Sequence, residues 1–97
     1  MYAEEYLSLV RDCKDEEKQF QFLKEDKPGV AVELAKSKNT SPRILDILTR
    51  HSAITVRHEV AKNPMTAIET LTRLSNDKDM LVRDYARRTL KSVEQTH

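Results

Sequence analysis

Few side chains in this chain of 97 residues could carry catalytic or metal chemistry. His51 and His58 are near each other in the sequence, but a metal site would need further ligands, and Cys13 and His97 are distant. The acidic neighbours of Cys13 disfavour its thiolate, which makes it a poor nucleophile. With one glycine, the chain has no glycine-rich phosphate loop. We therefore expect no enzyme activity, no cofactor and no metal.

Basic side chains recur at a fixed interval and could bind an acidic partner. A shift of the sequence along itself by ~26 residues places Arg57 on Arg83 and Lys62 on Arg88. We call this shift the repeat offset. If the offset is structural, these pairs project from equivalent points of successive layers. The candidate binding residues are Arg57, Lys62, Arg83, Arg87, Arg88 and Lys91. A ridge of this kind would suit the phosphates of nucleic acid or an acidic protein.

A structural role is the alternative for the same side chains. The guanidinium groups of Arg57 and Arg83 could instead bond helix-end carbonyls, or the acidic residues Asp77 and Asp79. The lysines could simply form a solvated helix face.

Composition indicates an all-α chain whose two parts differ in charge. Hydrophobic residues make up 38%, aromatic residues 5%, and one glycine with three prolines leaves little material for hairpins. Residues 1–29 hold five basic and eight acidic side chains, a net charge of −3. Residues 30–97 hold twelve basic and eight acidic side chains, a net charge of +4. This asymmetry could attract an acidic partner or another copy of the chain, although ordinary solvated helix faces are the simpler interpretation.

Three observations predict a cytoplasmic location. The N-terminus is acidic and lacks an apolar signal region, and no apolar run approaches transmembrane length. A single cysteine suits a reducing compartment. We therefore expect a soluble cytoplasmic protein that does not engage a membrane.

The first part of the chain predicts two amphipathic helices. The first covers residues 2–12, and the second runs from a cap at Asp15 to about residue 26, before Lys27-Pro28-Gly29. Four of the five aromatic side chains lie here: Tyr2, Tyr6, Phe20 and Phe22. We expect them to seal the N-terminal end of the fold, and the alternative is an anchor for a partner.

From residue 30 the sequence repeats itself at the same repeat offset. Val30 then coincides with Val56 and Val82, and Leu45 with Leu71. Each unit predicts two short helices. The first kind covers residues 30–37, 54–62 and 80 onward, and the second covers 41–50 and 67–75. Such helices are marginal alone, so stacking must stabilise them.

Three residues are predicted to cap these helices. Thr66 begins a capping box with Glu69, in which each side chain bonds an exposed backbone N–H group of the helix start. Thr40, followed by Ser41-Pro42, is expected to do the same job at the preceding equivalent helix. Asp79 is expected to cap a last helix that runs to about residue 94.

The best-preserved unit carries the motif Val56-Arg57-x-x-Val60-Ala61-x-Asn63-Pro64-x-Thr66, followed by Leu71-x-x-Leu74-Ser75-x-Asp77. It resembles the leucine-rich repeat variant and is similar, in a general way, to HEAT-type repeats. The resemblance covers about residues 30–90. It implies a right-handed superhelix of alternating short helices, of which the first can be 3₁₀, and a binding scaffold without common catalytic residues. Some members carry a cysteine-rich iron–sulfur segment, but this chain has only Cys13.

These observations predict a short right-handed α-solenoid of ~26-residue helical repeats with helical caps. Residues 1–29 would form the N-terminal cap and residues 30–97 the repeat region, divided into units of about 30–55 and 56–81 and a terminal capping helix, 82–97. The expected function is a non-enzymatic module that binds a protein partner or self-associates as a homo-oligomer. The alternative is binding of nucleic acid or another acidic partner through the basic ridge.

Overall fold

A computed structural model describes residues 2–95 of the chain and the side chains of residues 3–94. Within this range all regular structure is helical, which confirms the all-α prediction. The helices are α1 (Tyr2–Asp12), α2 (Glu16–Glu25), α3 (Val30–Lys36), α4 (Pro42–Leu48), α5 (Ile54–Lys62), α6 (Ile68–Leu74) and α7 (Met80–Gln95). The predictions for the side chain of Tyr2 and for His97 concern groups outside the described range.

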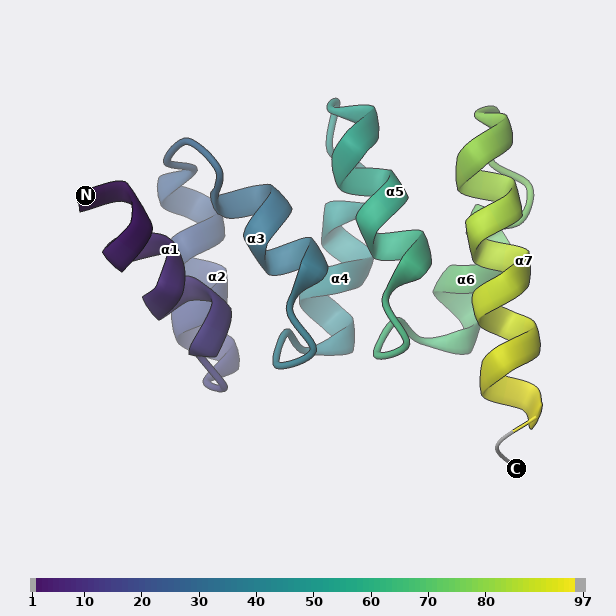
Figure 1. Cartoon of the computed structure of the whole chain (residues 1–97), viewed down its shortest axis with the longest axis horizontal. Helices are drawn as coiled ribbons and strands as arrows, with labels where there is room; N and C mark the ends of the chain where they lie inside the picture. The colour runs from purple at the N-terminus through teal and green to yellow at the C-terminus, as the bar shows by residue number, and fades with distance from the viewer. Residues whose placement is uncertain (1, 96–97) are drawn as a thin grey trace.

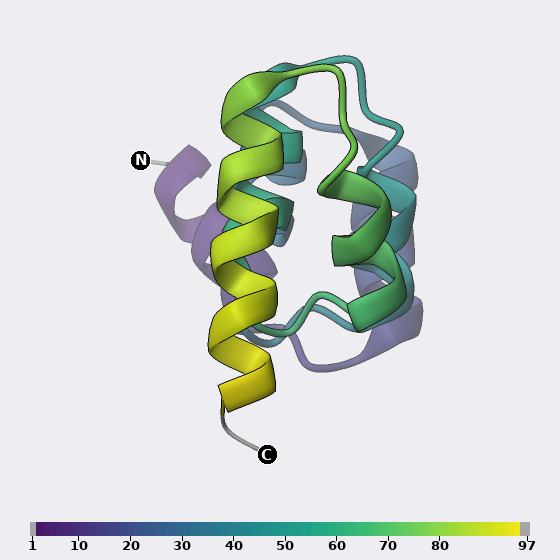
Figure 2. The same ribbon diagram turned by 90° about the vertical axis from the view of Figure 1, so that its right-hand side faces the viewer.

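The helices form two rows. An odd row of α1, α3, α5 and α7 lies side by side in chain order, each helix packing on the next (Figure 1). An even row of α2, α4 and α6 lies behind it, as the view along the rows shows (Figure 2). The described molecule measures 37 × 28 × 21 Å, and α1 and α7 close its two ends.

The helix boundaries follow the sequence pattern closely. The first residues of α4 and α6 are separated by the repeat offset, and so are their last residues. Helix α5 ends at the residue before Asn63-Pro64. Gly29 adopts a φ of 85°, so the chain turns between α2 and α3 at its one glycine. The first helix of each predicted unit is an α-helix and not 3₁₀.

The predicted capping box at Thr66 is wrong. Helix α6 is capped by Ala67, which makes no side-chain cap bond. Thr66 lies one residue too early to cap the helix, and it is buried, with its Oγ1 donating to the carbonyl of Val60 at 2.7 Å. The hydroxyl thus adds a second bond to the Val60 carbonyl, which also accepts from the N–H of Asn63, and it bonds no N–H group at the start of α6.

Thr40 behaves in the same way, which corrects the second predicted cap. Its Oγ1 donates to the carbonyl of Leu34 at 2.6 Å. Ser41 caps α4 instead, because its Oγ accepts from the N–H of Ile44 at 3.3 Å. The caps predicted at Asp15 and Asp79 are confirmed by bonds from Glu17 N–H (2.9 Å) and Val82 N–H (3.0 Å).

The core is built from positions that the repeat offset aligns. Val30, Val56 and Val82 are all buried, at no more than 1% exposure. Two aligned pairs of leucines are buried too: Leu45 with Leu71, and Leu48 with Leu74. Burial of equivalent positions is what joins helices of only two turns into one structure.

A line of polar side chains bonds each odd-row helix to the one before it. We call it the carbonyl ladder, and the repeat offset separates its members, Ser37, Asn63 and Thr89. The bonds run from Ser37 Oγ to Arg11 O (2.6 Å), from Asn63 Nδ2 to Ala35 O (2.9 Å) and from Thr89 Oγ1 to Ala61 O (2.6 Å). Each acceptor is the second-last residue of its helix, where carbonyls have no partner within the helix. Asn63 Nδ2 also donates to Ser37 O at 2.9 Å.

A buried glutamine connects the first two helix pairs. Gln19 is fully buried at the position that the repeat offset aligns with Leu45 and Leu71. Its Nε2 donates to the carbonyls of Cys13 and Asn39, both at 2.8 Å, and its Oε1 accepts from Ser41 N–H at 3.0 Å. Three bonds satisfy this amide, so its burial is compatible with a stable core.

The even row is joined by a carboxylate on α4. Asp46 Oδ1 accepts from Thr70 Oγ1 at 2.8 Å and from Arg73 Nη2 at 2.9 Å, and both donors lie on α6. The hydrogen bond from Thr70 is the largest cause of a lowered pKa at Asp46. Burial opposes it, and the hydrogen bond and charge of Arg73 lower the pKa further. The ionised carboxylate therefore stabilises the contact between α4 and α6.

Replacing Asn63 with alanine should destabilise the fold by about 2 kcal/mol, because it leaves the Ala35 carbonyl without a donor and removes one of the bonds to the Ser37 carbonyl. Urea unfolding followed by circular dichroism measures this change. The matched control is Asn76→Ala, since Asn76 is exposed. Its effect should stay within about 0.5 kcal/mol. Equal effects of the two substitutions would contradict the ladder.

The stability that Asp46 contributes should depend on pH. Its pKa is lower in the folded chain than in the unfolded chain, so the contribution is complete above the unfolded value of about 3.9 and is lost as the pH falls through the folded value. The difference in unfolding free energy between wild type and Asp46→Asn should therefore be larger at pH 6 than at pH 3. A difference that does not change with pH would refute this role.

Candidate functional site

The six basic candidates lie on two neighbouring helices of the odd row. Arg57 and Lys62 belong to α5, and the other four belong to α7. Their side chains divide into those that bond within the chain and those that do not. This division decides which of them can serve a partner.

Arg57 and Arg83 converge on the loop between α6 and α7. Arg57 Nε lies 3.3 Å from Asp77 Oδ2, and both side chains are only 13% exposed. Arg83 Nη1 donates to the carbonyls of Asp77 (2.9 Å) and Lys78 (3.2 Å). These are the contacts that the structural alternative describes. Both guanidinium groups stabilise the loop between α6 and α7, so their hydrogen-bond donors are engaged within the chain.

Lys62 contributes to a cluster between α5 and α7. Its Nζ lies 3.5 Å from Glu59 and 5.2 Å from the ring centre of Tyr85. The same ring meets His58 edge to face at 5.8 Å, and His58 Nε2 lies 2.9 Å from Asp79 Oδ2. The bond from Val82 N–H and the one from His58 lower the pKa of Asp79. These contacts stabilise the packing of α5 on α7. The ammonium group of Lys62 interacts with Glu59 and Tyr85 of the chain itself.

The remaining three candidates are free on α7. Arg87, Arg88 and Lys91 are exposed, and their side chains form no hydrogen bond or ion pair with the described residues. They follow one another at helical spacing, so they share one side of α7. We call them the α7 basic face. The structure therefore leaves three of the six candidates available to a partner, all on one helix.

The histidines and the cysteine have local contacts. His51 Nδ1 accepts from Ala53 N–H at 3.0 Å, and Cys13 Sγ donates to the carbonyl of Asp15 at 3.5 Å. Among the described residues, no group of three or more His, Cys, Asp or Glu side chains could hold a metal ion.

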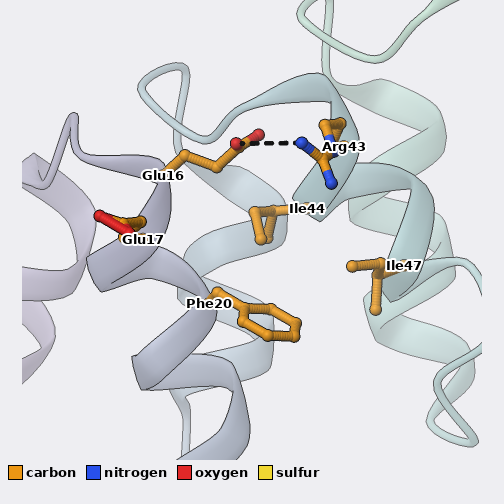
Figure 3. Close-up of a pocket in the computed structure, with 6 residues that line it drawn as sticks. All are labelled: Glu16, Glu17, Phe20, Arg43, Ile44 and Ile47. Carbon is orange, nitrogen blue, oxygen red and sulfur yellow. Dashed lines mark ion pairs between the residues drawn. The ribbon is translucent and has the colours of Figure 1, made fainter.

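A groove between α2 and α4 combines apolar side chains with an ion pair at its edge (Figure 3). We call it the α2–α4 groove, and it is lined by Glu16, Glu17, Phe20, Arg43, Ile44 and Ile47. Its volume is about 290 Å³. Phe20 and Ile47 face it from opposite sides and are 47% and 39% exposed (Figure 3). Arg43 Nη1 and Glu16 Oε1 form an ion pair of 3.6 Å across its edge.

Helical geometry explains why these apolar side chains remain outside the core. Phe20 and Phe22 are two positions apart, so they point to different sides of α2. Phe22 packs on the core and meets Tyr6 edge to face at 5.6 Å, whereas Phe20 turns toward α4. On α4, the stripe of Ile44, Leu45 and Leu48 is buried, which leaves Ile47 beside it.

The predicted aromatic seal is therefore only partly present. Tyr6 and Phe22 close the N-terminal end, and Tyr6 OH donates to Glu25 Oε1 at 3.1 Å. Partial burial, together with this hydrogen bond and the charge of Glu25, raises the pKa of Tyr6. Phe20 takes no part in the seal and faces the groove. Arg43 and Ile47 were not predicted as groove residues. The available signal was Ile47, an apolar residue of α4 outside the buried stripe of Ile44, Leu45 and Leu48.

None of the helices in the described range has both the length and the apolar character that crossing a membrane requires.

No protein-family model, curated protein or solved structure matches this chain. A function is therefore inferred from its own residues and contacts.

Proposed function

We propose that the chain is a non-enzymatic interaction module, a short right-handed α-solenoid of helical repeats that binds a protein partner. The observation that carries this proposal is the α2–α4 groove, an exposed apolar surface with a charged edge. The proposal assigns the surface to recognition, since the described residues around the groove offer apolar and charged anchoring contacts and no metal ligand set.

The equivalence of positions separated by the repeat offset supports the repeat part of the proposal. The aligned valines and leucines are buried together, and the carbonyl ladder recurs at the same interval. In this scheme α1 and α2 form the N-terminal cap, and the long α7 closes the other end. The resemblance to the leucine-rich repeat variant belongs to the same proposal, because that family combines short helices with a binding role.

The groove has the composition of an anchoring site for a peptide segment or a helix. Phe20, Ile44 and Ile47 supply an apolar floor, and aromatic side chains in such places dominate binding energies. Arg43 is 85% exposed beyond its contact with Glu16, so it can pair with a partner's carboxylate. A segment with apolar anchors and an acidic residue beside them fits these features best.

Truncating the groove should remove partner binding without unfolding the chain. Phe20→Ala with Ile47→Ala should weaken binding of a protein isolated with the chain from its source by at least about tenfold, or roughly 1.4 kcal/mol. Calorimetry of the purified pair measures the affinity, and circular dichroism checks the fold. The matched control is Ile68→Ala on α6, because Ile68 is 46% exposed but lies outside the groove. Undiminished binding by the double variant would overturn the assignment.

The alternative of nucleic-acid binding has to rest on the α7 basic face. Arg57 and Arg83 are held by Asp77 and the following loop, and Lys62 is shared with Glu59. Three free cations give a salt dependence of only about 2.7 in log–log slope on a duplex, which corresponds to weak binding.

We expect oligonucleotides to bind this chain more weakly than about 10⁻⁴ M at physiological salt. Fluorescence anisotropy with labelled single-stranded and duplex RNA and DNA measures the affinity. Micromolar binding that falls with salt and is lost in Arg87→Ala/Arg88→Ala/Lys91→Ala would favour the nucleic-acid alternative over the groove. An Arg43→Ala variant serves as the control, since Arg43 is an exposed arginine far along the chain from α7.

A further inference from the structure

The two ends of the odd row differ in charge. At one end, α1 carries the exposed residues Glu5, Leu9 and Asp12 at helical spacing, so two carboxylates flank one apolar side chain. At the other end, the α7 basic face presents three exposed cations. Two acids share α7 with them, the half-buried Asp84 and the exposed Glu94. The N-terminal end is therefore acidic where the C-terminal end is basic, which agrees with the net charges of −3 and +4 in the two parts of the chain.

Each end also exposes a large apolar side chain. Leu9 on α1 is 65% exposed and Met80 on α7 is 63% exposed, the two highest values among the large apolar residues described. Helices α3 and α5 are covered on both sides by neighbours in the odd row, whereas α1 and α7 each have one such neighbour (Figure 1). The outer sides of α1 and α7 are thus the places where the row could be extended.

We propose that α7 of one copy packs against α1 of a second copy, so that the chain associates head to tail. The α7 basic face would meet Glu5 and Asp12, while Leu9 and Met80 lose exposure to water. The occupant is a second copy because this chain itself supplies the complementary charge. An interface between two different surfaces forms open rows, or rings where the rotation closes.

This association does not depend on the groove. Phe20 and Ile47 lie between α2 and α4 (Figure 3), whereas α1 and α7 lie at the two ends of the odd row (Figure 1). A chain in a head-to-tail row would therefore keep its partner site open. Failure of partner binding at the groove and failure of self-association are separate results, obtained with separate variants.

Sedimentation velocity at increasing protein concentration, up to about 1 mM, tests the proposal. The wild type should associate in about 0.1 M salt and much less in about 1 M salt, because the screening length falls from roughly 10 Å to roughly 3 Å. Arg87→Glu/Lys91→Glu and, separately, Glu5→Lys/Asp12→Lys should each weaken association by at least about tenfold, since like charges then face each other. Thermal unfolding confirms that each variant remains folded.

Mixing the two variants gives the decisive result. Every contact between an α7 of one variant and an α1 of the other pairs opposite charges again, so association should return. A symmetric contact of α7 with α7 predicts instead that Glu5→Lys/Asp12→Lys alone associates like the wild type, because its α7 is unchanged. The matched control is Lys36→Glu/Lys38→Glu, which changes the net charge as much as the α7 variant does, at exposed sites of the middle of the chain. It should associate like the wild type. A wild type that stays monomeric at low salt, variants that still self-associate, or a mixture that stays monomeric would each overturn the proposal.

Discussion

Open carbonyl groups at the ends of short helices are the constraint on which this structure depends. Helix α3 leaves the carbonyls of its last two residues without a backbone partner, and burying such groups unsatisfied would cost more than so short a helix can supply. Ser37, Asn63 and Thr89 answer that need by donating across to the preceding helix of the odd row. Thr40 and Thr66 donate to carbonyls near the ends of the helices that directly precede them in the chain, α3 and α5. The polar residues of the turns therefore decide how one helix pair sits on the next.

This arrangement also determines which side chains remain for other molecules. Arg57 and Arg83 are used to hold the α6–α7 turn, in the same way that the ladder holds the other helix ends. Exposed charges remain on the two terminal helices, and exposed apolar side chains remain in the α2–α4 groove and at Leu9 and Met80. Function is thus expected at the edges of the stacked core, because the middle is occupied by contacts that keep it together.

Much of this fold could be predicted from the sequence. The repeat offset located the helices and the buried valines and leucines, since burial acts on every equivalent position alike. The Thr66 capping box failed because local pattern cannot tell an N-cap from a residue one position earlier whose hydroxyl bonds backward. The ladder was missed for a related reason: Ser, Asn and Thr differ in type, and only the fold brings each one to a carbonyl. The groove required knowing which side of α2 faces α4, which the sequence alone does not fix.

Native-state hydrogen exchange tests most directly whether the ladder couples the helix pairs into one unit. The account predicts that the slowest amides of α3 and α5 share a single opening free energy, equal to that of global unfolding, because neither helix can satisfy its ends alone. Amides of α3 that exchange at a much lower free energy, while α5 stays protected, would show that the pairs open independently and would contradict it.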